Sequence, residues 1–217
     1  MGGHVLKELA TQLEELGLVL RGGFYKEAPN ATTILIGNVG SQLWKPFANE
    51  IDWSNPHPLD HWTKLKLDPI ANTFKAKVIY PFVGPDYAPF QTWAMKADCV
   101  YPSPVGPLIH PDYGLWHAYR AAFTFEGQLA DLSNRDTRPS PCEACVEKPC
   151  ISACPVHAFD EGNFDASICM DHISSKEGIV CAYNGCRSRL ACPVGEEYSY
   201  CEEQMRFHMK KYLRSDI

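Results

Sequence analysis

Cysteine is the residue type whose spacing in this sequence points most directly to chemistry. The chain has ten cysteines; nine lie between Cys142 and Cys201, whereas Cys99 stands alone before them. Thiolates are soft ligands, and a 4Fe–4S cluster needs four of them. The first four cysteines of the group follow the pattern Cys-x2-Cys-x4-Cys-x3-Cys-Pro and are Cys142, Cys145, Cys150 and Cys154. A short run of this kind, with a cysteine before proline that reaches a second cluster, is typical of two-cluster ferredoxins.

A second group of cysteines completes the ligand count. Cys192 is also followed by proline, so the Cys-Pro ending occurs twice. If the two groups cross over as in ferredoxins, each cluster takes three cysteines from one group and one from the other. The ligands expected for cluster 1 are Cys142, Cys145, Cys150 and Cys192. Those expected for cluster 2 are Cys154, Cys169, Cys181 and Cys186, which leaves Cys201 spare.

Two other uses of clustered cysteines compete with iron–sulfur binding. Structural zinc sites usually pair two Cys-x2-Cys units, and this sequence has one such pair, Cys142 and Cys145. A disulfide framework needs an oxidising compartment. The first residues include the charged Lys7, Glu8 and Glu14 and show no apolar signal-peptide core. We therefore expect a cytoplasmic, reducing setting in which the cysteines bind clusters.

Composition and net charge argue against two further classes of protein, those that associate with membranes and those that bind nucleic acids. No apolar run approaches the roughly 18–20 residues that a membrane helix needs, so no membrane association is expected. The net charge of −6 argues against a nucleic-acid partner, because such proteins carry a basic surface. The abrupt rise in cysteine content predicts two domains, residues 1–137 and residues 138–217, the second ending in a helix.

The elements that must position these residues follow from hydrophobic periodicity. Apolar residues at helical spacing predict an opening helix, and the β-branched run Thr32–Ile36 predicts a strand. Further helices are expected from Ser41 and from Pro58. A proline-rich, irregular excursion over residues 81–112 then precedes a strand at Leu115–Phe125. Interleaved helices and strands indicate an α/β or α+β class.

One polar and aromatic segment of the first domain suggests a ligand site. His110 precedes a proline, which favours extended or turn geometry, and Gly114 permits a backbone that a side chain would block. Together with Tyr113 and Arg120, His110 would present polar groups at the mouth of an aromatic-lined cleft. Such a cleft suits a large, flat ligand fringed with amides. The competing interpretation is that Trp116 belongs to the core or surface of a strand and that His110 only caps the turn.

The same segment, Ile109-His110-Pro111-x-Tyr113-Gly114-x-Trp116-x-Ala118-x-Arg120, resembles the corresponding segment of CblC-type cobalamin-processing proteins. Upstream motifs, Leu43-Trp44-Lys45-Pro46-Phe47 and Pro58-Leu59-Asp60, occur in the family's order, so the resemblance covers about residues 5–132. It implies an α+β, nitroreductase-like (CblC-type) domain with a cobalamin pocket, followed here by a bacterial-ferredoxin-like module with two 4Fe–4S clusters. The cobalamin-binding residues that it implies are His110, Tyr113, Gly114, Trp116 and Arg120.

A cobalamin domain followed by a two-cluster module predicts a cobalamin-binding iron–sulfur oxidoreductase. Clusters of low potential are suitable one-electron donors to cobalt. The corrinoid would then be reduced, lose its upper ligand, or reduce a substrate in turn. The same domain order occurs in epoxyqueuosine reductases and reductive dehalogenases, which gives two variants of this hypothesis. The alternative is a non-catalytic, ferredoxin-type electron carrier whose first domain docks a partner.

The hypothesis also specifies partners. The expected ligand is a corrinoid, and the expected electron donor is a ferredoxin, a flavodoxin or a reductase. Nitroreductase-like folds suggest a homodimer by analogy. Flavin is a further alternative to cobalamin in a nitroreductase-like cleft. It is supported only by Arg21-Gly22-Gly23, which could contact a phosphate, because no glycine-rich phosphate loop supports it. No residue is assigned a catalytic role.

Overall fold

The computed structural model describes residues 2–26, 30–129, 132, 136–160 and 163–213. The chain divides into two compact units. Unit 1 consists of Met1–Cys99 and His117–Thr137, and unit 2 consists of Val100–Trp116 and Arg138–Ile217.

The segment Val100–Trp116 is where this division departs from the predicted domains, which placed it in the first. Its apolar residues Ile109 and Leu115 are buried in one cluster with Cys150 and Cys192. The segment belongs to unit 2 because its apolar side chains pack against these cysteines. A boundary drawn at one point of the sequence could not anticipate that an internal segment packs against cysteines far along the chain.

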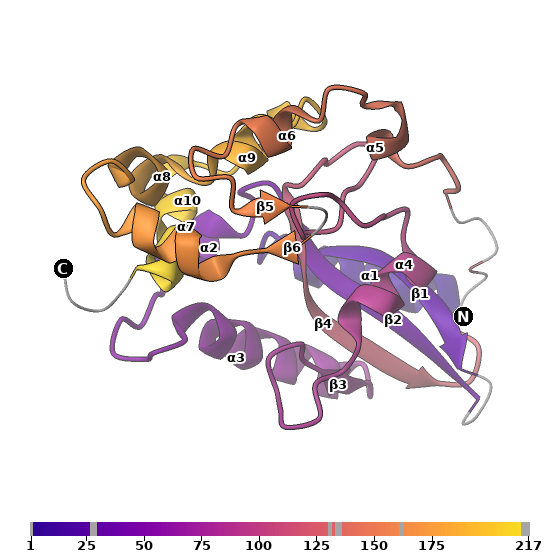
Figure 1. Ribbon diagram of the computed structural model, residues 1–217. Helices are drawn as coiled ribbons and strands as arrows, with labels where there is room; N and C mark the ends of the chain where they lie inside the picture. The colour runs from indigo at the N-terminus through magenta and orange to yellow at the C-terminus, as the bar shows by residue number, and fades with distance from the viewer. Residues whose placement is uncertain (1, 27–29, 130–131, 133–135, 161–162, 214–217) are drawn as a thin grey trace. The chain divides into compact units, whose positions relative to one another are not determined.

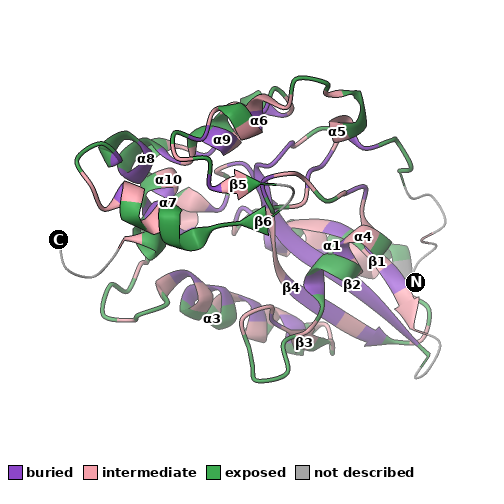
Figure 2. Ribbon diagram, in the orientation of Figure 1, coloured by how far each residue is buried: buried purple, intermediate pink, exposed green. Residues whose placement is uncertain are grey.

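Unit 1 is built on an antiparallel sheet with helices beside it. Its elements are α1 (Gly2–Glu14), β1 (Val19–Lys26), β2 (Ala31–Val39), α2 (Trp44–Ala48), α3 (Pro58–Thr73), β3 (Lys77–Ile79), α4 (Phe90–Ala97) and β4 (His117–Glu126). The sheet has four strands in the order β1-β2-β4-β3, and each neighbouring pair is antiparallel. Helices α1 and α4 contact β1, and α3 contacts β3 (Figure 1). The central strand β2 is buried along its whole length (Figure 2), as expected for a β-branched run with a strand on each side.

Most predicted elements of unit 1 are present, and two details differ. Helix α4 lies inside the excursion that was predicted to be irregular. It begins immediately after Pro89 and has no proline within it, so the prolines flank the helix and do not interrupt it. The residue that directly precedes α2 is not the predicted Ser41 but Leu43, whose side chain makes no capping hydrogen bond.

Unit 2 consists of short helices and one small hairpin. Its elements are α5 (Pro141–Ala144), α6 (Pro149–Ser152), β5 (Phe159–Asp160), β6 (Asn163–Phe164), α7 (Ala166–Ile173), α8 (Ile179–Asn184), α9 (Arg187–Leu190), α10 (Glu202–Met209) and 3-10 turns at Glu196–Tyr198 and Lys210–Tyr212. Cysteines take part in two of its apolar clusters. Segments this short bury little apolar surface by themselves, so a further cross-link such as a metal centre is physically reasonable.

Candidate functional site

Four cysteines of unit 2 line one cavity. They are the four predicted for cluster 1, namely Cys142, Cys145, Cys150 and Cys192. Cys142 and Cys150 each follow the proline that begins their helix, α5 and α6, and Cys192 lies two residues after α9. Further walls of the cavity are apolar and come from Ile109, Pro149 and Val194. The fold therefore gathers these thiols, which are far apart in sequence, in surroundings that hold little water.

Burial and polar neighbours act in opposite directions on the thiols of this cavity. Burial is the largest effect and raises the pKa of Cys142, Cys150 and Cys192 above their ordinary value. The Lys148 ammonium acts to lower the pKa of Cys142, and the backbone N–H of Val194 acts to lower that of Cys192. Lys148 Nζ also donates a hydrogen bond to the Cys142 carbonyl. Burial thus favours the neutral thiol at these three cysteines, while a cation and an N–H donor lie where they would stabilise metal-bound thiolates.

The four cysteines predicted for cluster 2 line a second cavity of unit 2. They are Cys154, Cys169, Cys181 and Cys186. Helices α7 and α8 carry Cys169 and Cys181, while Cys186 immediately precedes α9. Apolar side chains that line the cavity include Phe159, Ile173 and Met209, and polar ones include Arg187 and Ser188.

The thiols of the second cavity influence one another. Burial, followed by the neighbouring Cys186, Cys154 and Cys181, raises the pKa of Cys169 to about 11. The backbone N–H of Ala158 donates to Cys154 Sγ at 3.3 Å. Four thiols this close cannot all ionise without nearby positive charge, which bound iron would supply.

The raised pKa of Cys169 predicts that the metal-free protein loses stability at alkaline pH. Its folded-state pKa of about 11 lies above the ordinary value of 9.0, so the thiol deprotonates more readily in the unfolded chain. The resulting stabilisation is fully present below pH 9 and is lost as the pH rises through about 11. Anaerobic denaturation of the apoprotein on either side of this window measures the effect. Wild type should lose more stability than Cys169→Ser, and equal losses would contradict this role for Cys169.

The grouping of ligand-type side chains bears on metal binding at both cavities. Within the described ranges, no three His, Cys, Asp or Glu side chains are grouped so that they could hold one metal ion. Four thiols line each cavity, and their use as ligands of a 4Fe–4S cluster stays a prediction.

Three residues of the predicted cobalamin site form one tight turn in unit 2. The rings of His110 and Tyr113 stack with their centroids 4.2 Å apart. His110 Nδ1 accepts the backbone N–H groups of Asp112 at 3.0 Å and Tyr113 at 3.3 Å. Gly114 closes the turn with a φ of +53°. The geometry of His110 is therefore that of a turn cap, as the competing interpretation had it.

The other two predicted cobalamin residues have different surroundings. Trp116 is buried in unit 2, with its ring against that of Tyr200. Arg120 belongs to β4 of unit 1, where its Nε donates to Asn38 Oδ1 at 3.1 Å. The five residues are thus divided between the two units, and their contact with a corrinoid stays a prediction.

No pattern in the sequence indicated Arg189, which contacts two aromatic rings and a backbone carbonyl of unit 2. Its guanidinium carbon lies 4.4 Å from the ring centroid of Trp116 and 4.4 Å from that of Tyr200. Its Nε donates to the Leu115 carbonyl at 3.1 Å. Because these partners are remote in sequence, no local spacing could have indicated them. Arg189 links the segment before β4 to the helix that follows Cys186.

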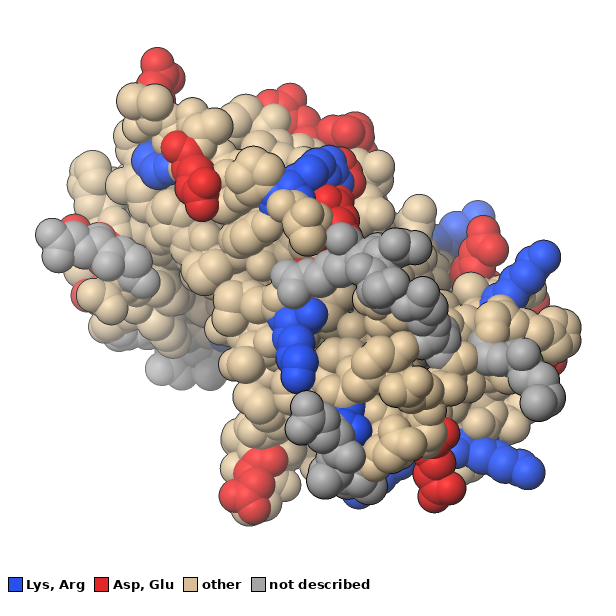
Figure 3. Space-filling view, turned by 90° about the vertical axis from the view of Figure 1, so that its right-hand side faces the viewer, with Lys and Arg blue, Asp and Glu red and all other residues tan. Residues whose placement is uncertain are grey.

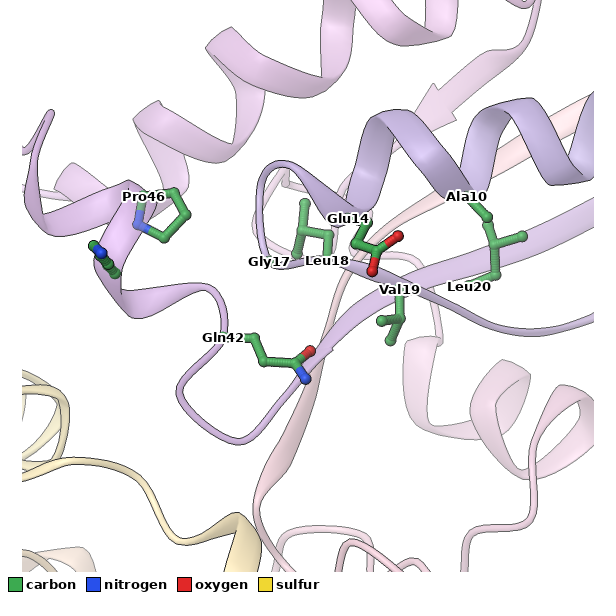
Figure 4. A pocket seen from close by; sticks show the side chains of 9 residues that line it. Ala10, Glu14, Gly17, Leu18, Val19, Leu20, Gln42 and Pro46 are labelled. Carbon is green, nitrogen blue, oxygen red and sulfur yellow. The ribbon is translucent and has the colours of Figure 1, made fainter.

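Unit 1 contains a cavity of its own, of about 530 Å³ (Figure 4). It lies where the end of α1, the start of β1 and α2 meet. Its lining is mixed, with Glu14 and Gln42 beside Leu18, Val19 and Pro46. The volume falls within the range of small-molecule sites, but none of the five predicted cobalamin residues lines it.

Arg21, one of the three residues that suggested the flavin alternative, has a carboxylate partner within unit 1. Arg21 lies in β1, and its side chain is buried. Its Nε donates to Asp98 Oδ2 at 2.9 Å, and the hydroxyl of Tyr119 donates to the same oxygen at 2.9 Å. Arg21 is therefore already paired with the partly buried carboxylate of Asp98.

Charged side chains are mixed in sign on the face drawn in Figure 3. Blue basic and red acidic groups are scattered among larger areas of other residues. In the part of the chain that the structure describes, no helix combines the length and apolar character needed to cross a membrane.

Comparison with known proteins identifies a similar fold. The structure resembles that of a C. elegans B12-trafficking protein, CblC, described as a homologue of human MMACHC, with a TM-score of 0.56. The two chains are 12% identical, and the match covers 100% of this chain and 98% of that one. No family model and no curated protein matches the sequence. The predicted mixed α+β, CblC-type fold is thereby confirmed, and the likeness extends beyond residues 5–132. The ferredoxin-like module stays a prediction.

Proposed function

We propose that this protein is a cobalamin-binding iron–sulfur oxidoreductase whose unit 2 holds two 4Fe–4S clusters. The observation that carries the proposal is the separation of eight cysteines into two cavities of four. The separation is crossed in sequence, because Cys192 joins the first set and Cys154 joins the second. Simple burial of thiols gives no reason for a crossed arrangement, whereas two-cluster ferredoxins require one.

Each set of cysteines has features that would serve a bound cluster. When bound, the clusters would supply one-electron transfer at low potential. Apolar side chains such as Ile109 and Ile173 line the two cavities beside the thiols. The Lys148 ammonium beside Cys142 and the Ala158 N–H on Cys154 Sγ would offset negative charge on the thiolates.

Cobalamin is the proposed ligand because two independent features favour it. The segment from Ile109 to Arg120 resembles that of cobalamin-processing proteins. The fold is similar over the whole chain to that of a protein described as B12-trafficking. At low identity this likeness concerns the fold, so the corrinoid is a proposal that needs a direct binding test. The epoxyqueuosine-reductase-like and dehalogenase-like variants share this corrinoid and differ in the final substrate.

Anaerobic reconstitution followed by a cobalamin titration tests the proposed function. Wild type should become brown, hold two clusters by iron and sulfide content, and shift the visible spectrum of added cobalamin. His110→Ala and Arg120→Ala should each weaken binding about tenfold, because each removes a polar contact of about 1.4 kcal/mol. His61→Ala, at an exposed position of α3, is the matched control and should bind like wild type.

The outcomes separate the hypotheses. If both clusters are intact but added cobalamin shows no spectral shift, the proposal that the protein binds a corrinoid is excluded. The non-catalytic electron carrier is then the better explanation. If the cobalamin spectrum shifts but the protein holds no iron or sulfide, the proposed iron–sulfur clusters are excluded instead. Normal cobalamin binding by both variants would show that the corrinoid lies away from His110 and Arg120.

A further inference from the structure

Ser188 is a buried hydroxyl that the fold of unit 2 does not explain. It lies in α9, between two arginines, and is 1% exposed. Within the described residues, its Oγ has no hydrogen-bond partner. A buried hydroxyl without a partner is costly, so its retention calls for a group outside the described protein atoms.

The location of Ser188 points to the group that it would meet. Ser188 lines the second cavity together with Cys154, Cys169, Cys181 and Cys186. A cluster held by these cysteines would bring its inorganic sulfides into this cavity. Sulfide and thiolate sulfurs carry negative charge and accept hydrogen bonds, so they are suitable acceptors for an O–H donor.

Among the described residues, the other two polar side chains that line this cavity besides the cysteines are not fully buried as Ser188 is. Arg187 is exposed and His172 is half-buried, so solvent can reach both. Ser188 is enclosed, and a donor without competing water acts more strongly on a neighbouring charge.

The first cavity offers no comparable hydroxyl. Its described lining residues besides the cysteines are apolar except for Lys148, whose Nζ donates to the Cys142 carbonyl. The two cavities therefore have the same number of thiols, but a neutral hydroxyl lines only the second among the described residues. This difference would give the two clusters different environments.

We propose that Ser188 donates its hydroxyl proton to a sulfur of the second cluster and thereby raises that cluster's midpoint potential. The inference rests on the proposed function, since it requires a cluster in the second cavity. A reduced cluster carries one more negative charge than the oxidised one, so a fixed donor stabilises the reduced form more. Ser188 acts here as a tuning residue and is not a ligand.

Redox titration of the reconstituted full-length protein, followed by electron paramagnetic resonance (EPR), tests the inference. Ser188→Ala should lower one of the two midpoint potentials and leave the other unchanged. We expect the equilibrium constant for reduction to fall about tenfold, which equals a shift of about 59 mV for a one-electron couple. Ser188→Thr, which keeps a hydroxyl, should stay close to wild type. Ser140→Ala is the matched control, because Ser140 is also buried in unit 2 but lines neither cysteine cavity.

A second measurement covers the case in which Ser188→Ala does not assemble its cluster. Hyperfine spectroscopy of reduced wild type in H2O and D2O should reveal an exchangeable proton coupled strongly to one cluster, and its absence would overturn the inference. Two intact clusters with unchanged potentials in Ser188→Ala would also overturn it and leave the proposed function standing. A wild-type protein that takes up no iron or sulfide would overturn the proposed function as well.

Discussion

Cys150→Ala is expected to remove one of the two clusters, so that the reconstituted protein holds about half of the wild-type iron and sulfide. Cys150 is a buried member of the first set, and no spare cysteine lines that cavity. A cubane with three thiolates is open to solvent at one iron and is expected to be lost during isolation. Cys181→Ala should have the complementary effect, because Cys181 is a buried member of the second set.

Iron and sulfide analysis with EPR distinguishes these variants. Each single variant should keep the signal that the other one loses, and the double variant should keep neither. Cys201→Ala is the matched control, since Cys201 lies in the same unit but lines neither cysteine cavity. Full iron content in Cys150→Ala, or loss of a cluster in Cys201→Ala, would contradict the ligand assignment.

Gly114→Ala is expected to destabilise unit 2 by about 4 kcal/mol. The φ of Gly114 is +53°, and a Cβ placed there would lie 1.8 Å from the carbonyl oxygen of Val194. The backbone of one of these loops would have to move, and Val194 follows closely on Cys192. We therefore expect the variant also to hold less iron in the first cavity.

Gly106→Ala is the control that separates the effect of the close approach to Val194 from the effect of a positive φ. Gly106 has a φ of +94°, but a Cβ there would meet nothing within 4 Å. The free energy of unfolding of Gly106→Ala should therefore fall by only about 1–2 kcal/mol, the cost of an alanine with left-handed backbone geometry. Chemical denaturation of both variants, followed by cluster absorbance, makes the comparison. Equal losses would show that the close approach to Val194 is not a constraint on the protein.

The features of this fold that sequence could predict are those encoded locally. The β-branched run at Thr32–Ile36 gave the buried strand β2, and Pro58 marked the start of α3. The repeated Cys-Pro ending, which is part of a known ligand pattern, predicted that Cys154 and Cys192 belong to crossed groups. The structure places each of them in the cavity expected for it.

Features that depend on pairing between distant segments could not be predicted. The assignment of Val100–Trp116 to unit 2 follows from burial of Ile109 and Leu115 with cysteines far along the chain. Likewise, Ser188 and Arg189 carry no local signal, since their importance comes from a cavity and from rings that other segments supply. Spacing thus anticipated which cysteines line each cavity, whereas their role as cluster ligands stays a prediction and their surroundings required the three-dimensional structure.

Electron transfer from the protein to a corrinoid in a single turnover tests the central proposal most directly. Anaerobically reconstituted wild type would be reduced, freed of reductant, mixed with cobalamin, and followed by absorbance and EPR. We expect the reduced-cluster signals to decay as reduced corrinoid forms in proportion, and Cys150→Ala to deliver fewer electrons per protein. Reduced clusters that persist beside an unchanged cobalamin spectrum would contradict the proposed function.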